Sequence, residues 1–291
     1  MLLLFLVGLT AVASQEIRPP PVQCPTCIKV DNICHNISHL LQLQASFRTV
    51  VVITELGILR SKNILFYAFE PNITDKEYYK VGYVNLDNFN ETGVVVGASA
   101  VNLITFDIIQ SNGTIYYGGG DALYVSDKFN TVHFFGSKAD RIRSVVVYKN
   151  EVHFVRDGEG KIVKKQGDNF KIYDLYTSVK NFLINKEGNM FFLNNSGLYL
   201  NRFETDLTVR LSKNNFFRGL TMDLNENFYA WWIDGIYKVV KGRDFLDAKL
   251  VRVADIPNIG AMTFDNGNNF LFTTSKSLFK LTSTNDADVR C

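Results

Sequence analysis

Few residues of this 291-residue chain have the types and spacing that catalysis needs. No Gly-x-Ser-x-Gly motif is present to mark a nucleophilic serine on a strand-to-helix turn. The four histidines lack the spacings of zinc ligands, and His35 and His39 have no third ligand nearby. The sequence therefore predicts a protein that is not an enzyme and carries no cofactor or metal.

Three cationic side chains are the clearest candidates for binding a ligand. Arg143, Lys180 and Arg218 each stand just before a short apolar run, and Asn181 follows Lys180. Arginine and lysine side chains gathered at one site bind carboxylates through charge-assisted hydrogen bonds. If the fold brings the three runs together, these residues form a site for an anionic small molecule; otherwise they are solvated charges on a rim.

Aromatic residues offer a wall for a flat ligand. Tyr229 and Trp231 alternate within the run 228–232, which also holds the second tryptophan of the chain, Trp232. Most residues of this kind pack between sheets. Tyr229 and Trp231 are nevertheless kept as candidate ligand-binding residues beside the cations.

A repeat decides which elements position these residues. Short β-branched or aromatic runs bounded by Asn, Asp and Gly are typical of strands and tight turns. The last five aromatic-rich runs begin about 37 to 42 residues apart, the length of a four-stranded propeller blade. The six runs begin at Ile64, Ile115, Val152, Met190, Phe228 and Phe270. They predict an all-β fold, a six-bladed β-propeller of four-stranded antiparallel blades, over a sandwich pair or seven blades.

The innermost strand of each blade starts near one mouth of the axial channel, so Arg143, Lys180 and Arg218 should meet there from three consecutive blades. A calcium-dependent lactonase would need carboxylates and amides at the same place. No acidic residue stands there in the units that align, although amides are available from Asn102, Asn181 and Asn258. The Asp223 and Asp265 turns are expected to bond their own backbone.

The ring is expected to close through the N-terminal part of the chain. The last unit ends at Cys291 with three strands, so a fourth is predicted within 47–55, which would remove an exposed edge. The predicted organisation is a signal peptide at 1–14, a Cys-containing leader at 15–46 with a short helix at 37–45, and a propeller at 47–291. Among three pairings of four cysteines, Cys27–Cys34 and Cys24–Cys291 are predicted, the second stapling the closure.

The first residues and the composition indicate a secreted, extracellular protein. An apolar run followed by small residues is typical of a signal peptide. Four cysteines suit an oxidising compartment. The formal net charge of +2 disfavours nucleic acid or a membrane surface as a partner. Five Asn-x-Ser/Thr sequons predict glycosylation, at Asn36, Asn72, Asn90, Asn112 and Asn194.

The sequence resembles a known family in its overall organisation. An N-terminal apolar segment, the prolines at 19–21, the cluster Cys24, Cys27 and Cys34, the Asn-rich repeats and the terminal Cys291 are similar to those of the ommochrome-binding proteins of moths and butterflies. The resemblance implies an extracellular carrier in a haemolymph-like fluid that binds ommatins, which are planar pigments bearing carboxylates. It assigns no binding residues.

Together, these observations predict a non-catalytic secreted carrier of a planar anionic small molecule, an ommochrome pigment. The alternatives are a propeller enzyme of the gluconolactonase-like or yellow-like type and a propeller that binds proteins. The missing carboxylates at the channel mouth disfavour the enzyme. A protein-binding propeller would expose a contiguous aromatic patch.

Overall fold

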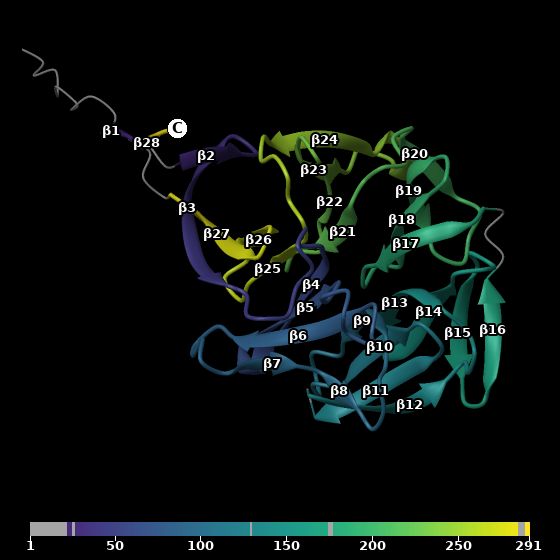
Figure 1. Cartoon of the computed structure of the whole chain (residues 1–291). Helices are drawn as coiled ribbons and strands as arrows, with labels where there is room; N and C mark the ends of the chain where they lie inside the picture. Colours follow the sequence, from purple (N-terminus) through teal and green to yellow (C-terminus); the bar gives the residue numbers. More distant parts are fainter. Residues whose placement is uncertain (1–21, 25–26, 129, 174–176, 285–288) are drawn as a thin grey trace, which may run out of the picture.

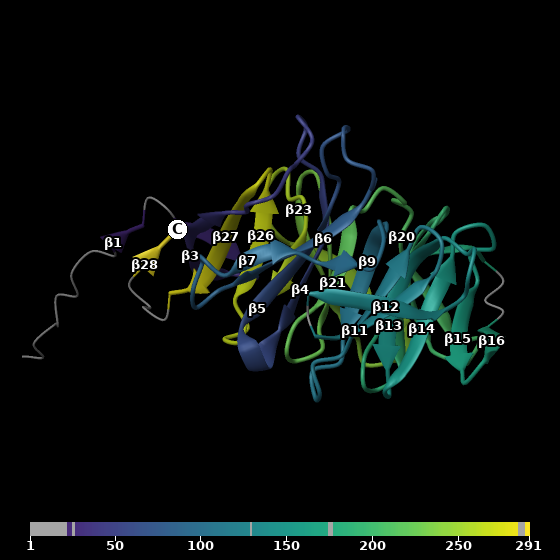
Figure 2. The ribbon, with the colours of Figure 1, turned by 60° about the horizontal axis from the view of Figure 1, so that its bottom comes forward.

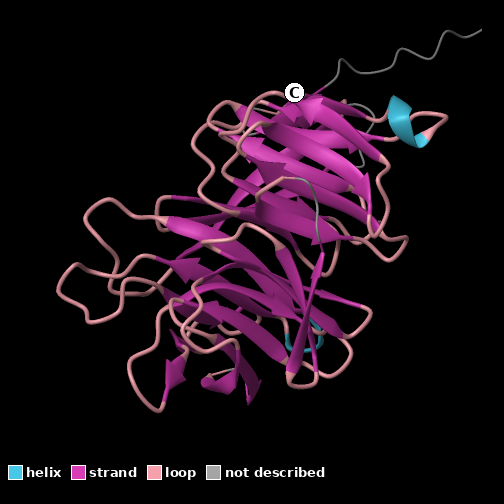
Figure 3. Cartoon of the chain, turned by 90° about the vertical axis from the view of Figure 1, so that its right-hand side faces the viewer, coloured by secondary structure: helices cyan, strands magenta, loops and turns pink. Residues whose placement is uncertain are grey.

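Six sheets surround a central axis in the computed structural model, which describes residues 22–24, 27–128, 130–173, 177–284 and 289–291 (Figure 1). The sheets are the blades of a six-bladed β-propeller, as predicted. Figure 2 shows the same ring tilted, with the short strands β1 and β28 projecting beside it. Strands and loops make up nearly all of the molecule (Figure 3).

The first three blades follow one another along the chain. Blade 1 consists of β4 (Ile53–Leu59), β5 (Ile64–Phe69), β6 (Lys80–Asn85) and β7 (Thr92–Val94). Blade 2 consists of β9 (Leu103–Ile108), β10 (Ile115–Gly119), β11 (Leu123–Lys128) and β12 (Thr131–Gly136), with β8 (Val96–Gly97) pairing parallel to β12. Blade 3 consists of β13 (Ile142–Tyr148), β14 (Glu151–Arg156), β15 (Ile162–Gln166) and β16 (Asn169–Tyr173).

The other three blades complete the ring. Blade 4 consists of β17 (Val179–Ile184), β18 (Asn189–Asn194), β19 (Gly197–Arg202) and β20 (Thr208–Ser212). Blade 5 consists of β21 (Gly219–Met222), β22 (Phe228–Trp232), β23 (Gly235–Val240) and β24 (Lys249–Ala254). Blade 6 consists of β25 (Met262–Phe264), β26 (Phe270–Thr274), β27 (Ser277–Ser283), β3 (Ile33–Gln42) and β2 (Cys27–Val30). Two single-turn 3-10 helices, η1 (Arg60–Lys62) and η2 (Phe245–Asp247), lie in connections, and β1 (Val22–Gln23) pairs with β28 (Val289–Arg290).

The turns between strands follow from residue chemistry. The Asp223 carboxylate accepts hydrogen bonds from the backbone N–H groups of Asn225 and Asn227, at 2.9 and 2.8 Å. The Asp265 carboxylate does the same for Gly267 and Asn269, at 2.9 and 2.8 Å. Such self-bonded aspartates replace the hydrogen bonds that the chain loses on leaving a sheet. The expectation that these two aspartates shape turns is confirmed.

Aromatic side chains fill the spaces between neighbouring blades. Phe66 of blade 1 faces Phe106 of blade 2 with 6.1 Å between ring centres. Phe191 of blade 4 lies 5.3 Å from Phe228 of blade 5. Each fully buried ring of this size stabilises the fold by about 1.5–3 kcal/mol through removal of its surface from water. The second strand of each blade supplies most of these rings, which explains why the aromatic repeat marks the blades so clearly.

The ring does close through an N-terminal strand, but a different one from that predicted. The partner of β27 is β3, with Leu281 opposite Ile37 and Leu278 opposite Leu41. The segment 47–55 instead leads into β4, the inner strand of blade 1. Because β3 covers 33–42, the predicted helix at 37–45 is wrong, and propeller strands begin at Cys27 within the predicted leader. Pairing with the open edge of β27 outweighs the weak helical preference of this segment.

The disulfides also differ from the prediction. Cys24 pairs with Cys27, and Cys34 pairs with Cys291 with 5.7 Å between their Cα atoms. The register explains the change, because β2 and β3 place Asn36, and not Cys34, opposite Cys27. Beyond β27, the N–H of Thr284 donates to the carbonyl of Cys34, which guides the C-terminal end toward that cysteine. The predicted function of closing the ring belongs to Cys34–Cys291.

Four of the five predicted glycosylation sites have exposed asparagines, namely Asn36, Asn72, Asn90 and Asn112. Asn194 is 2% exposed, and its Nδ2 donates to the Thr177 hydroxyl oxygen at 2.7 Å. A glycan on that nitrogen would break the contact and meet packed protein. The structure therefore argues against Asn194 as a glycosylated residue.

The predicted signal peptide at 1–14 lies outside the described residues. Among the residues that are described, none forms a helix long and apolar enough to cross a membrane.

Candidate functional site

The inner strands β4, β9, β13, β17, β21 and β25 surround an axial channel of about 680 Å³. Each blade contributes a few side chains from its inner strand, so the wall combines residues far apart in the sequence. Among the predicted residues, Arg143, Lys180, Asn181 and Arg218 all line this channel. The fold therefore brings together the three cations that the sequence singled out.

Backbone irregularities place two of these cations. The pairing of β13 with β14 skips Arg143, and the pairing of β17 with β18 skips Lys180, so each is the extra residue of a β-bulge. Thr54 and Ile104 occupy equivalent bulges in blades 1 and 2. A bulge turns an otherwise alternating side chain in a new direction. The repeat of this bulge at one end of the inner strands explains why Arg143 and Lys180 reach the channel.

The three cations are not equally available to a ligand. Arg143 forms an ion pair with Asp157, whose other carboxylate oxygen lies 3.3 Å from Nε of Arg141. Arg218 is exposed and uses one nitrogen to donate to the carbonyl of Ile259 at 3.1 Å. Lys180 is partly buried, and no carboxylate of the described residues pairs with it within ion-pair distance. Of the three predicted cations, Lys180 and Arg218 are therefore the more available to an anion.

Only one of the two predicted aromatic residues lines the channel. Trp231 lines the channel, and its indole N–H donates to the carbonyl of Gly260 at 3.1 Å. Tyr229 is packed between blades 5 and 6 instead, with its ring centre 5.0 Å from that of Phe264. Tyr229 lies on β22, the second strand of its blade, and its side chain points toward blade 6 and not toward the axis. Tyr229 is therefore a core residue.

Of the three asparagines considered as metal ligands, two have structural roles outside the channel. Oδ1 of Asn102 accepts the backbone N–H groups of Tyr78 and Tyr79 and so holds a loop. Asn258 lies in a turn with a positive φ of 60°. Asn181 remains in the channel, where its Oδ1 lies 3.4 Å from the hydroxyl of Ser144. Only one of the three amides therefore faces a ligand.

Glu55 is the functional candidate that the sequence analysis missed. It follows the bulge of blade 1 as Asn181 follows the bulge of blade 4, and it lines the same channel. Its Oε2 accepts the backbone N–H of Phe106 at 3.2 Å. Glu55 lines the channel and is partly exposed as a residue, while its carboxyl is enclosed by protein. This desolvation, with a smaller contribution from the charge of Asp107, raises the pKa of Glu55 to about 8, despite opposing hydrogen bonds.

Asp107 is a second carboxyl group further along the channel. Its two oxygens accept the backbone N–H groups of Val147, at 2.6 Å, and Ile108, at 2.8 Å. Burial raises the pKa of Asp107 to about 6, and these two bonds limit the rise. Asp107 links β9 to β13 and is ionised near neutral pH, whereas Glu55 is mostly protonated there. These two carboxyl groups of the channel therefore differ in protonation state.

A signal for Glu55 was present in the sequence. Glu55 precedes Ile64, the first residue of its aromatic-rich run, by the same number of residues as Asn181 precedes Met190, the first residue of the corresponding run. The prediction that 47–55 closes the last blade removed this residue from the comparison. The statement that no acidic residue stands at the channel mouth is therefore wrong.

The donor set of the channel does not fit a metal ion. Within the described ranges, no group of three or more His, Cys, Asp and Glu side chains lies close enough to hold one. Lys180 and Arg218 share the channel with Glu55 and would repel a cation, while both oxygens of Asp107 already accept backbone N–H groups. The arrangement favours an anion beside one titratable carboxyl.

Comparison with solved structures places the fold among known propellers. A gluconolactonase from Xanthomonas campestris superposes with a TM-score of 0.66 and 11% identity, over 92% of this chain and 99% of its own. A virginiamycin B lyase from Staphylococcus aureus gives a TM-score of 0.60 and 10% identity, over 85% and 99%. No family model matches the chain, and no curated protein matches it.

These neighbours correct the prediction that the protein is not an enzyme, because proteins named as a gluconolactonase and a lyase share its fold. That prediction was drawn from a missing serine motif and missing zinc spacings, which are signatures of other folds. At identities of 10 and 11% the similarity establishes the fold alone, and the activity has to be argued from the channel residues.

Proposed function

We propose that this chain is an enzyme that hydrolyses a small carboxylate-bearing lactone or ester in the axial channel. The observation that carries the proposal is a carboxyl group of raised pKa, Glu55, in the same cavity as Lys180 and Arg218. A general acid or base works best when its pKa lies near the working pH. The gluconolactonase and the lyase of the same fold support an enzyme over a passive carrier.

The chemistry assigned to Glu55 is proton transfer. In its ionised form, Glu55 takes a proton from a water molecule as that water attacks the carbonyl carbon of the substrate. The carbonyl oxygen becomes an oxyanion, which Lys180 and Arg218 stabilise through their charge. The protonated Glu55 then donates its proton to the alkoxide that leaves when the C–O bond breaks. Glu55 ends the cycle ionised, and the products are a carboxylic acid and an alcohol.

The preference for a charged substrate follows from the same two cations. A carboxylate on the substrate gains charge-assisted hydrogen bonds of roughly 1.5–3 kcal/mol each. Two backbone N–H groups donate to Asp107 and partly offset its negative charge further along the channel.

The test compares hydrolysis of the γ-lactones of gluconic and glucaric acid, since the second bears the extra carboxylate. We expect wild type to hydrolyse the glucaric lactone with the higher kcat/KM. Arg218→Ala should remove most of this preference while the slower reaction of the neutral lactone persists. Hydrolysis of neither lactone nor of any matched anionic ester above the buffer rate would refute the proposal.

The ligand class predicted from the resemblance to ommochrome-binding proteins stays a proposal of its own. A planar anion such as an ommatin would bind in the same channel, with its carboxylates on Lys180 and Arg218 and its rings on Trp231. Spectral titration of wild type with an ommatin tests this binding directly. Competition between the ommatin and lactone hydrolysis would place both in one site. The proposed location is extracellular, in keeping with the two disulfides.

A further inference from the structure

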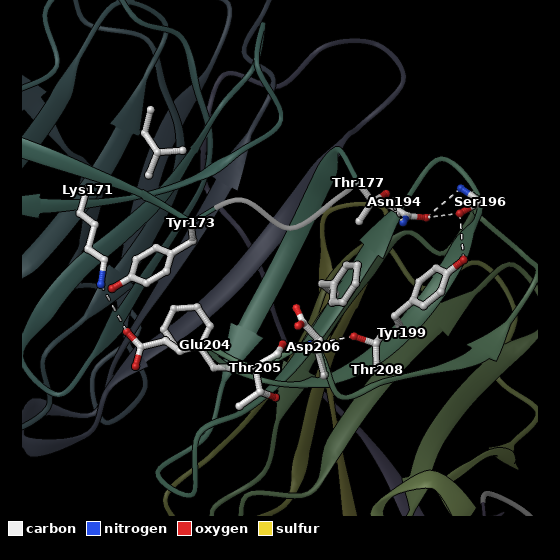
Figure 4. Close-up of a pocket in the computed structure, with 14 residues that line it drawn as sticks. Lys171, Tyr173, Thr177, Asn194, Ser196, Tyr199, Glu204, Thr205, Asp206 and Thr208 are labelled. Carbon is white, nitrogen blue, oxygen red and sulfur yellow. Dashed lines mark hydrogen bonds and ion pairs between the residues drawn. The ribbon is translucent and has the colours of Figure 1, made fainter.

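A second large cavity lies away from the axis, between blades 3 and 4 (Figure 4). This inter-blade pocket has a volume of about 890 Å³, which is enough for a drug-sized molecule. None of its lining residues lines the axial channel. Its walls come from β16, β18 and β19 and from the turn between β19 and β20. No role in the proposed hydrolysis accounts for it.

Aromatic rings form two sides of the pocket. Phe192 and Tyr199 are stacked with 5.2 Å between ring centres and 13° between their planes. Tyr173 and Phe203 lie 5.0 Å apart and belong to a cluster with the buried His153. Figure 4 shows Tyr173 on one side of the cavity and Tyr199 on the other. Phe191 and Phe228 pack where blades 4 and 5 meet, beside a cavity of about 210 Å³, whereas the rings here border one of about 890 Å³.

One buried polar atom in the wall lacks a partner. Asn201 is 1% exposed, and its Nδ2 donates to Thr205, Leu207 and Thr208. Its Oδ1 is buried and accepts no hydrogen bond from any described residue. Leaving such an acceptor unpaired costs about 1–3 kcal/mol. A ligand with an N–H or O–H group would recover that energy.

The charges around the pocket exclude the kind of ligand that the channel favours. Lys171 lies 4.0 Å from Glu204 and is partly neutralised by it. Asp206 is exposed at the rim and adds a negative charge. Among the described residues that line the pocket, one cation and two carboxylates offer an anion no net attraction. An uncharged or weakly cationic molecule fits better.

We propose that the inter-blade pocket binds a neutral planar aromatic molecule that donates a hydrogen bond. The stacked pair Phe192 and Tyr199 provides a flat platform for its rings. Asn201 accepts the hydrogen bond and fixes the orientation of the molecule. This site is independent of the axial channel, so both can be occupied together.

The probe for the test is N-phenyl-naphthylamine, a neutral aromatic amine with one N–H group that fluoresces in apolar surroundings. We expect saturable binding of one equivalent to wild type. Tyr199→Ala removes the exposed half of the platform and should raise the Kd at least tenfold. Tyr199→Phe keeps the ring and should bind nearly as wild type does, which separates loss of stacking from a general disturbance of the fold.

A second variant blocks the opening without removing a buried group. Ile172 lines the pocket on the outer strand β16 and is 51% exposed, so Ile172→Trp should also weaken binding. Val251 on the outer strand β24 is 44% exposed and lies outside the pocket, which makes Val251→Trp the matched control. Non-saturable binding, or equal affinities for wild type, Tyr199→Ala and Ile172→Trp, would overturn the proposal.

Discussion

The axial channel and the inter-blade pocket are built from different strands of the same ring and differ in their chemistry. The channel gathers several side chains from most blades, among them Glu55, Lys180 and Arg218. The pocket takes its residues from only two blades and presents stacked aromatic rings beside Asn201. The inner strands thus collect charges from distant parts of the sequence, whereas the pocket between two blades places aromatic rings beside polar side chains.

The difference also shows where this propeller departs from its own repeat. Inner strands leave a lumen at the axis in any propeller that does not fill it with side chains. The spaces between blades are normally packed, because neighbouring sheets bury their aromatic faces against each other. The opening between blades 3 and 4 is therefore the less expected of the two cavities. The channel follows from the fold, and the pocket follows from particular residues.

The largest expected effect tests whether the channel depends on closure of the ring. The Cys34–Cys291 disulfide joins residues 257 apart, and its removal should lower the free energy of unfolding by about 5 kcal/mol in the chain-entropy model. Cys291→Ser should thus unfold at a much lower denaturant concentration. Cys24→Ser, which opens a link between residues 3 apart, is the control and should matter much less. Equal losses in both variants would contradict the closure assigned to Cys34–Cys291.

The next effect concerns the loss in free energy of unfolding that follows from burying Glu55 in the channel. The folded chain keeps a proton on Glu55 up to a pH of about 8, while the unfolded chain releases it near 4.5. Folding therefore binds a proton between these values, and stability falls as the pH rises. Glu55→Gln should remove this loss and be more stable than wild type at pH 8, by on the order of a few kcal/mol.

Denaturation curves at several pH values measure that difference. The two proteins should have closer stabilities at pH 4 than at pH 8. A stability difference that does not change with pH would show that Glu55 titrates normally. Glu55 would then behave like a carboxyl group on the protein surface, and the channel would not desolvate it.

A smaller effect separates the two cavities by ligand charge. Arg218→Ala should weaken binding of an anionic ligand about tenfold, which corresponds to 1.4 kcal/mol. The affinity for N-phenyl-naphthylamine should not change, since Arg218 does not line the inter-blade pocket. Isothermal titration of both ligands on this one variant gives the comparison. A loss of both affinities would mean that the cavities are coupled.

The smallest effect sharpens the selectivity of the inter-blade pocket. Asp206→Lys reverses an exposed charge at its rim, and exposed charges in water are worth up to about 1 kcal/mol. The variant should bind anilinonaphthalene sulfonate, an anion of similar shape to the neutral probe, several-fold better than wild type. Affinity for the neutral probe should stay the same. An unchanged affinity for the sulfonate would show that the charge of Asp206 does not make the inter-blade pocket select against anions.

The repeat in the sequence was sufficient to predict the blades, because each aromatic run that starts a second strand packs against a neighbouring blade. Phe228 and Phe270 begin β22 and β26 as predicted. The partner of β27 could not be predicted in the same way. Residues 33–42 lack that pattern, and their strand exists only because β27 offers an open edge.

The channel cations were predictable for a similar reason, since Arg143 and Lys180 recur at one position of the repeat. Glu55 stands one position later in the repeat, where blade 4 has Asn181, so the recurring cations do not mark it. Tyr229 shares the aromatic pattern without reaching the axis. The inter-blade pocket left no signal in the sequence. Whether Tyr199 packs against a neighbour or borders an opening depends on the distance between two blades, which no local pattern records.

The pH dependence of lactone hydrolysis tests the central claim most directly. With the γ-lactone of glucaric acid, kcat/KM of wild type should rise with pH and level off above a midpoint near 8, the pKa of Glu55. Glu55→Gln should lower the rate about 10²–10⁴-fold and abolish that midpoint. Hydrolysis by Glu55→Gln at the wild-type rate, or a wild-type rate that does not change between pH 6 and pH 9, would contradict the assignment of Glu55 as the general base.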